Sequence, residues 1–130
     1  MELICNKEQY WDFIRELRNM DGVRQGFINQ DYITVEEHAL FMKKYSNCFY
    51  ICLVDNSPAG YVGVIKDDIR VATHPDFQGQ GVGKYMINEL MNIHKDAVAK
   101  VKISNKASLN LFQACGFEKK YYILEKTNAS

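Results

Sequence analysis

Apolar residues recur at helical spacing in two early stretches of the chain and predict two amphipathic helices. The first stretch lies near the amino terminus and places on one face Tyr10, Phe13, Ile14 and Leu17. The second begins at Thr34, with Glu37 three positions later, which is the sequence of a capping box. Asn6 and Gln9 offer the same pairing to the first helix. We expect residues 23–33, which have no clear period, to form a loop that lines a pocket.

Shorter apolar runs rich in β-branched and aromatic residues predict strands in the remainder of the chain. They cover residues 1–5, 48–55, 61–65, 69–73, 97–104 and 118–126. Turn-forming residues separate the runs in the middle of the chain, and this predicts an antiparallel meander. Helical patterns from Gly83 to about Lys95 and from about Ala107 to Ala114 interrupt the later runs. Strand, helix and strand in this order predict a right-handed crossover with a ligand crevice at the carboxyl ends of the strands.

The composition of the chain predicts one globular domain that spans residues 1–130, since 47% of the residues are hydrophobic and 25% are charged. Lysine plus arginine and aspartate plus glutamate both number 16. The net charge of zero offers no basic field for nucleic acid and no basic run for a membrane surface. No apolar segment approaches the length of a membrane span or resembles a leader. The four cysteines form no Cys-x-x-Cys pair and have no histidine at zinc-binding spacing, so we expect a cytoplasmic protein with reduced thiols and no metal site.

The predicted strand that ends at Thr73 leads into a glycine-rich loop and then into a helix. The residues of this loop are Gln78, Gly79, Gln80, Gly81, Val82, Gly83 and Lys84. Main-chain N–H groups at the start of a helix lack acceptors and carry partial positive charge, so the loop predicts a phosphate cradle. It is not a P-loop, because Gly83-Lys84 is followed by Tyr85. Its glycine spacing also differs from that of the dinucleotide-binding fingerprint.

Two sequence patterns together carry a resemblance to a known family. The first is Gln78-Gly79-Gln80-Gly81-Val82-Gly83, which matches Gln/Arg-x-x-Gly-x-Gly/Ala and follows Thr73-His74-Pro75. The second consists of Asn105, Ser108, Phe112, Gly116 and Phe117. In this order the patterns resemble the acetyl-CoA loop and the second signature of the GNAT-type N-acetyltransferases. The resemblance implies an α/β fold with a mixed, mostly antiparallel central sheet, a β-α-β acetyl-CoA-binding core and about four helices.

The resemblance also implies which residues contact acetyl-CoA, the expected co-substrate. Main-chain groups of Val71 and Thr73, on either side of Ala72, are expected along the pantetheine arm. The N–H groups that follow Gln78, from Gly79 to Lys84, are expected to hold the pyrophosphate. Near the thiol end the resemblance places Asn105, Ser108 and Phe112.

Phe112 departs from the family pattern, because many members carry at this position a tyrosine that protonates the leaving thiolate. Tyr121 and Tyr122 are candidate substitutes, and alternation along a strand allows only one of them to reach the site. We take Tyr122 as the candidate acid. Water is the other option, and β-strand preference alone is the better explanation of both tyrosines.

For the general base the resemblance indicates a carboxylate early on the strand before the glycine loop, where Asp67 and Asp68 stand. Both also suit a turn. His74 and His38 are further candidates, although a His-Pro pair is common at this place and then has a structural role. The predicted catalytic set is Asp68, Asn105 and Tyr122.

The resemblance implies direct transfer of an acetyl group from acetyl-CoA to a primary amine, and we expect that of a small molecule. Because none of the candidate bases is strong and well placed, we expect an acceptor amine of low pKa, which is already partly unprotonated at pH 7. The amine of a nucleotide-linked amino sugar is one example. The sequence around Arg18 and Arg24 loosely resembles that of GNAT enzymes that acetylate such sugars. These two arginines are candidates for binding a diphosphate. The alternatives are a protein N-terminal or lysine acetyltransferase, and a non-catalytic acyl-CoA-binding regulatory domain. A homodimer is left open.

Overall fold

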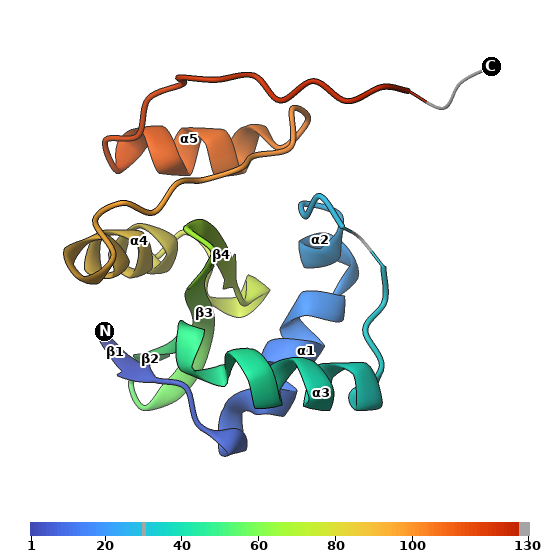
Figure 1. Ribbon diagram of the computed structural model, residues 1–130. Helices are drawn as coiled ribbons and strands as arrows, with labels where there is room; N and C mark the ends of the chain where they lie inside the picture. The colour runs from blue at the N-terminus through green and yellow to red at the C-terminus, as the bar shows by residue number, and fades with distance from the viewer. Residues whose placement is uncertain (30, 128–130) are drawn as a thin grey trace.

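The computed structural model describes residues 1–29 and 31–127, and at the centre of these residues is a four-stranded antiparallel sheet (Figure 1). In sheet order the strands are β1 (Glu2–Cys5), β2 (Phe49–Val54), β3 (Ser57–Ile65) and β4 (Asp68–Thr73). The α-helices around it are α1 (Trp11–Asn19), α2 (Asp21–Arg24), α3 (Val35–Tyr45), α4 (Val82–Ile93) and α5 (Lys106–Ala114). Single turns of 3₁₀ helix connect them at η1 (Glu8–Tyr10), η2 (Ser46–Cys48) and η3 (Pro75–Phe77). Over the described ranges, no helix has both the length and the apolarity needed to cross a membrane.

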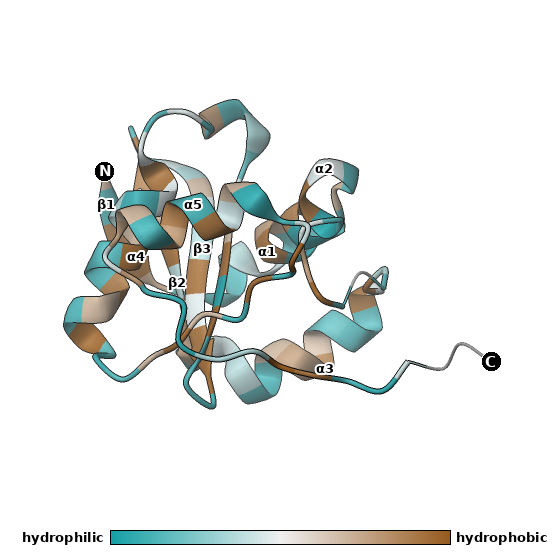
Figure 2. Ribbon diagram, turned by 90° about the horizontal axis from the view of Figure 1, so that it is seen from above, coloured by the Kyte–Doolittle hydropathy of each residue, from teal (hydrophilic) through white to brown (hydrophobic). Residues whose placement is uncertain are grey.

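The sheet separates two hydrophobic cores, one under each layer of helices. The core on the side of α1 and α3 contains Ile14, Leu17, Met42, Phe49, Ile51, Tyr61 and Ala72. The core on the side of α4 and α5 contains Cys52, Ala59, Val62, Ile69, Val82, Met86, Ile87, Leu90 and Phe112. Strand alternation produces this division, since adjacent residues of β3 such as Tyr61 and Val62 belong to different cores. Figure 2 shows the apolar strands at the centre of the molecule, between helices with polar outer surfaces.

The predicted caps at the starts of the first two helices have different outcomes. Thr34 Oγ1 accepts a hydrogen bond from Glu37 N at 3.1 Å, and this confirms the cap of α3. The prediction for Asn6 is wrong, because Asn6 Nδ2 donates to Ser46 Oγ at 3.2 Å. That bond ties the start of the chain to the end of α3. The first helix begins instead through η1, without a side-chain cap, and becomes α-helical at Trp11.

Two predicted strands are wrong. Residues 97–104 meet the sheet through one parallel bridge, in which Ile69 N donates to Val98 O at 2.9 Å and Val98 N donates to Asp67 O at 2.7 Å. Beyond this bridge the segment departs from β4 to reach α5. Residues 118–126 are extended and exposed, and they have no strand partner in the described chain, since the neighbouring edge is not formed. The β-α-β core therefore consists of β4, α4 and this bridge, and α2 adds a helix where a loop was predicted.

Candidate active site

The start of α4 forms an open cradle of main-chain donors. Gly79 and Gly81 both have a φ of 79°, a left-handed conformation that glycine adopts without strain. A Cβ atom at either position would meet no heavy atom within 4 Å, so the loop borders open space. Tyr85 N donates the first helical bond, to Gly81 O at 3.0 Å, and the N–H groups of residues 82–84 therefore lack acceptors within the helix. This cradle fits an anionic group such as a pyrophosphate.

A free main-chain edge of β4 lies next to the cradle. Ile69 N donates outwards, away from β3, so strand alternation turns the main-chain groups of Val71 and Thr73 towards the same side. Along residues 1–29 and 31–127, nothing forms a main-chain hydrogen bond with Val71 or Thr73 on that side. Ala72 lies between them with its main chain towards β3 and its side chain in the α1 core. The amide groups of an extended ligand can therefore pair with Val71 and Thr73.

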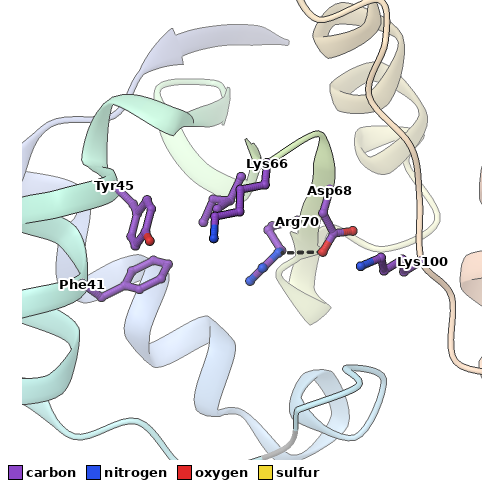
Figure 3. Close-up of a pocket in the computed structure, with 7 residues that line it drawn as sticks. Phe41, Tyr45, Lys66, Asp68, Arg70 and Lys100 are labelled. Atoms are coloured by element: carbon purple, nitrogen blue, oxygen red, sulfur yellow. Dashed lines mark ion pairs between the residues drawn. The ribbon is translucent and has the colours of Figure 1, made fainter. Parts of the chain in front are cut away.

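At the other end of β4 a pocket of about 270 Å³, which we call the Asp68 pocket, lies between α3, the β3–β4 turn and the segment after α4 (Figure 3). Its lining residues are Phe41, Tyr45, Ile65, Lys66, Asp68, Arg70 and Lys100. Asp68 Oδ2 lies 3.3 Å from Arg70 Nε, whereas Asp68 Oδ1 is buried and accepts no hydrogen bond from the described residues. A buried oxygen without a donor costs free energy, so this atom has capacity to accept an N–H from a ligand.

The cradle and the Asp68 pocket lie at opposite ends of β4. The bridge between Asp68 and Val98 marks the point at which β4 and the following segment separate. From Asp68 to Thr73 the strand advances roughly 17 Å, at the usual rise of about 3.3 Å per residue. A ligand that places a pyrophosphate on the cradle and extends along β4 therefore brings its far end towards Asp68.

Asn105 connects the start of α5 to the loop after α2. Asn105 Oδ1 accepts a hydrogen bond from Ser108 N at 3.0 Å, as an N-cap does. Asn105 Nδ2 donates to Gly26 O, also at 3.0 Å. A Cβ atom at position 26 would lie 2.9 Å from that nitrogen, so any other residue there would have to displace the Asn105 amide. Asn105 thus joins the start of α5 to the loop after α2.

Phe112 is buried, and the two candidates for the catalytic acid, Tyr121 and Tyr122, are exposed. Phe112 is 5% exposed and packs against Phe117 with 5.1 Å between the ring centroids, so it fills the core beside α4. Tyr121 and Tyr122 are 90% and 91% exposed on the extended segment after α5. The strand that would have directed one of them to the site is not formed. The structure does not bring Tyr122 together with Asp68 and Asn105.

The two histidine candidates have structural contacts. His38 is buried and its Nε2 donates to Trp11 O at 2.8 Å. Burial lowers the pKa of His38, which keeps the ring neutral at pH 7. His74 Nδ1 accepts a hydrogen bond from Asp76 N at 3.1 Å and caps η3. These contacts favour the structural interpretation of both histidines.

The arginines near α2 are engaged within their own loop. Arg18 lies over the ring of Phe27, 4.1 Å from its centroid, and donates to Asn29 O. Burial lowers the pKa of Arg18, so its surroundings are only partly solvated. Arg24 pairs with Asp21 at 3.2 Å. Binding of a diphosphate by Arg18 and Arg24 stays a prediction that requires these contacts to open.

The lining of the Asp68 pocket contains residues that sequence reasoning missed. Phe41 and Tyr45 come from α3 and Lys100 follows α4, so the fold alone brings them to Asp68. Lys66 is the one lining residue that stands out within its own local sequence. Lys66 has a φ of 51° in a tight β3–β4 turn, where asparagine or glycine is usual.

Fold and site together define an α/β domain with a phosphate cradle at a helix start and a carboxylate pocket at the far end of the adjoining strand. The chain belongs to the acetyltransferase (GNAT) family, whose model matches residues 10–117. The predicted family and the fold class are confirmed, and membership of this family is consistent with acetyl-CoA as the co-substrate.

One curated protein that the chain resembles is an uncharacterized N-acetyltransferase of Methanocaldococcus jannaschii, at 26% identity over 96 residues. The match covers 61% of this chain and 42% of that protein, so the chain spans less than half the length of this relative.

Solved structures of acetyltransferases share the fold. A spermidine N-acetyltransferase from Vibrio cholerae, in complex with CoA and spermine, has a TM-score of 0.81 and 17% identity, covering 96% of this chain and 85% of that one. A ribosomal-protein-alanine N-acetyltransferase from Brucella melitensis has a TM-score of 0.76 and 16% identity, covering 91% and 85% of the two chains. Because the identities are low, these similarities concern the fold alone.

Proposed function

We propose that the chain transfers the acetyl group of acetyl-CoA directly to the primary amine of a small molecule. The observation that carries this proposal is the arrangement along β4, where the cradle, the free edge and the unpartnered Asp68 Oδ1 follow one another. Acetyl-CoA supplies the acetyl group when bound and leaves as the free thiol. Residues 79–84 hold its pyrophosphate, and the outward groups of Val71 and Thr73 orient the arm.

The residues of β4 also support the chemical step. The acceptor nitrogen bonds to the thioester carbonyl carbon while the carbon–sulfur bond breaks. Asp68 Oδ1 accepts a hydrogen bond from the amine and takes its proton, directly or through one water. An outward N–H of β4 donates to the carbonyl oxygen and stabilises its developing negative charge. Since a thiol has a pKa near 8.5, its thiolate leaves readily and takes a proton from water.

Within this class we propose an amine of low pKa, such as that of a nucleotide-linked amino sugar. A lysine amine with a pKa near 10.4 is almost wholly protonated at pH 7, whereas an amine near 7.7 to 8.0 is partly free and needs a weaker base. A protein N-terminal amine is the second candidate, because one protein of similar fold is a ribosomal-protein-alanine N-acetyltransferase. A non-catalytic acyl-CoA-binding domain is the third, because Phe112 is buried and both candidate tyrosines are exposed. Cytoplasmic location and a homodimer stay predictions.

Thiol release from acetyl-CoA tests the proposal across a panel of amines. The panel contains nucleotide-linked amino sugars, free amino acids, polyamines, N-terminal peptides and lysine peptides. We expect turnover with small amines of low pKa. Turnover confined to lysine peptides would contradict this acceptor, and tight acetyl-CoA binding without any turnover would favour the non-catalytic domain.

A further inference from the structure

We propose that the Asp68 pocket selects an acceptor that carries an anionic group, a phosphate or a carboxylate, close to its amine. This inference rests on the proposed function, because it assigns the amine to Asp68. The pocket is lined by one carboxylate and by three cationic side chains, those of Lys66, Arg70 and Lys100. This excess of positive charge attracts an anion and repels a polyamine.

The three cationic side chains of the Asp68 pocket have hydrogen-bond donors that a ligand can use. Arg70 contacts Asp68 through Nε, and its guanidinium end points away from Asp68 on the side of Phe41 (Figure 3). Lys66 and Lys100 are exposed and form no salt bridge within the part of the chain that the structure describes. Lys66 and Lys100 approach the pocket from opposite sides, the first from the β3–β4 turn and the second from the segment after α4 (Figure 3). Arg70 and Asp68 lie between the two lysines in this view, so an anionic group beside either lysine would receive a charge-assisted hydrogen bond from it.

The backbone at Lys66 supports a role for its side chain beyond the turn. Lys66 and Asp67 have φ angles of 51° and 64°, and the turn is held by the pairing of Ile65 with Asp68. Asparagine or glycine occupies such positions with less strain than lysine. Lysine is therefore unfavourable for the turn itself, whereas its ammonium group adds charge to the pocket.

The remaining wall of the Asp68 pocket suits the body of a small molecule. Phe41 and Tyr45 lie on α3 with 4.8 Å between their ring centroids, and both side chains are half-buried. Aromatic faces of this kind pack against a sugar or another ring. A volume of about 270 Å³ is slightly below the range of pockets for drug-sized ligands and suits a single small ring.

A second pocket has two carboxylates and, among the described residues, no lysine or arginine in its lining. It lies between α1 and η3, and its lining includes the carboxylates of Glu16 and Asp76 with His74. His74 follows the carboxyl end of β4, so this pocket is separated from Asp68 by the length of the strand. The excess of positive charge in the Asp68 pocket thus favours an acceptor unlike spermidine.

Matched pairs of amines test the proposal directly. One arm compares glucosamine with its 6-phosphate and with a nucleotide-linked glucosamine; another compares β-alanine with its amide; spermidine is included. We expect the anionic member of at least one pair to have a kcat/KM at least tenfold above its neutral partner, and added salt to reduce this preference. The arms distinguish a phosphate from a carboxylate. Equal use of charged and neutral partners, or spermidine as the best acceptor, would overturn the proposal.

Variants then locate the preference. Lys66→Asn and Lys100→Gln should each raise KM for the anionic acceptor about two- to fivefold, as for exposed charge pairs, with the neutral acceptor unaffected. Lys66→Asn should also keep or raise the melting temperature, because asparagine suits the turn. Lys95→Gln, an exposed lysine outside the pocket, is the control. Equal effects on charged and neutral acceptors would show that the lysines act through structure, and would refute the proposal.

Failure of the proposed function can be separated from failure of this inference. If no amine is acetylated, calorimetric titration of UDP and of inorganic phosphate into the CoA-saturated protein measures anion binding alone. Binding that weakens in Lys100→Gln but not in Lys95→Gln would support the anion site without acetyl transfer. Absence of binding at millimolar concentration would overturn it.

Discussion

Replacing Gly81 by aspartate separates the charge at the cradle from the stability of the helix that forms it. Gly81 is the N-cap of α4 and has a φ of 79°, a conformation that asparagine and aspartate adopt more readily than other residues with a Cβ. The new side chain meets no heavy atom within 4 Å at its Cβ, and its carboxylate interacts favourably with the helix dipole. We expect the free energy of unfolding without ligand to change by no more than about 1 kcal/mol.

The carboxylate introduced by Gly81→Asp would also repel a bound pyrophosphate. Two like charges 4 Å apart repel by about 1 kcal/mol in water and by about 4 kcal/mol at an effective dielectric constant of 20. Since Gly81 is exposed, we take a value of about 2 kcal/mol, which raises Kd roughly 30-fold. Acetyl-CoA at ~100 times the parent Kd stabilises the parent by roughly 2.7 kcal/mol. At the same concentration it would stabilise the variant by only about 0.9 kcal/mol.

Thermal unfolding with and without acetyl-CoA measures this difference. For a chain of this length the parent melting temperature should rise by about 10 °C and that of Gly81→Asp by about 3 °C. Gly81→Asn is the matched control, because asparagine has the shape of aspartate without its charge and should keep most of the shift. A full shift in the aspartate variant would refute the position of the phosphates, and equal losses in both variants would refute the role of charge.

Three further changes test other parts of the molecule. Asp68→Asn keeps the shape of the side chain but removes its basic oxygen, so steady-state kinetics should show kcat lower by roughly 10²- to 10⁴-fold and an unchanged KM for acetyl-CoA; a much smaller loss would place the base elsewhere. Burial lowers the pKa of folded His38 below 6.5, so the unfolded state takes up the proton first and stability should fall as pH decreases from 7 through 6.5. His38→Gln should flatten this dependence in chemical denaturation at several pH values, and parallel curves for the two proteins would contradict the assignment. Ending the chain after Phe117 removes residues 118–127, which are exposed and form no hydrogen bond with the rest of the described chain, together with the last three residues; the free energy of unfolding should change by less than about 0.5 kcal/mol and thiol release should persist. Loss of thiol release would restore a role for Tyr122.

Features that depend on neighbours in sequence were predicted well. The glycine loop and α4 are local, because the conformations of Gly79 and Gly81 and the helical period after them involve adjacent residues. The cap of α3 by Thr34 is local in the same way. The second use of Asn105 was not predictable, since its bond to Gly26 joins residues 79 positions apart.

The wrong strands and the missed pocket have a common physical cause. Strand preference becomes a strand only where a partner edge is available, and the segment after Val98 departs from β4 before it can provide one. Without that edge, residues 118–126 have no partner either. The Asp68 pocket likewise depends on tertiary structure, because Phe41 and Lys100 reach it from elements distant in sequence.

The open edge of β4 has a consequence for the behaviour of the protein in concentrated solution. An unpaired strand edge accepts any extended chain, and each molecule also carries such a chain in residues 118–127, where Tyr121 and Leu124 are 90% and 91% exposed. Acetyl-CoA that lies along β4 would occupy this edge. The co-substrate should therefore suppress self-association as well as supply the acetyl group, and light scattering of the concentrated protein should fall when CoA is added.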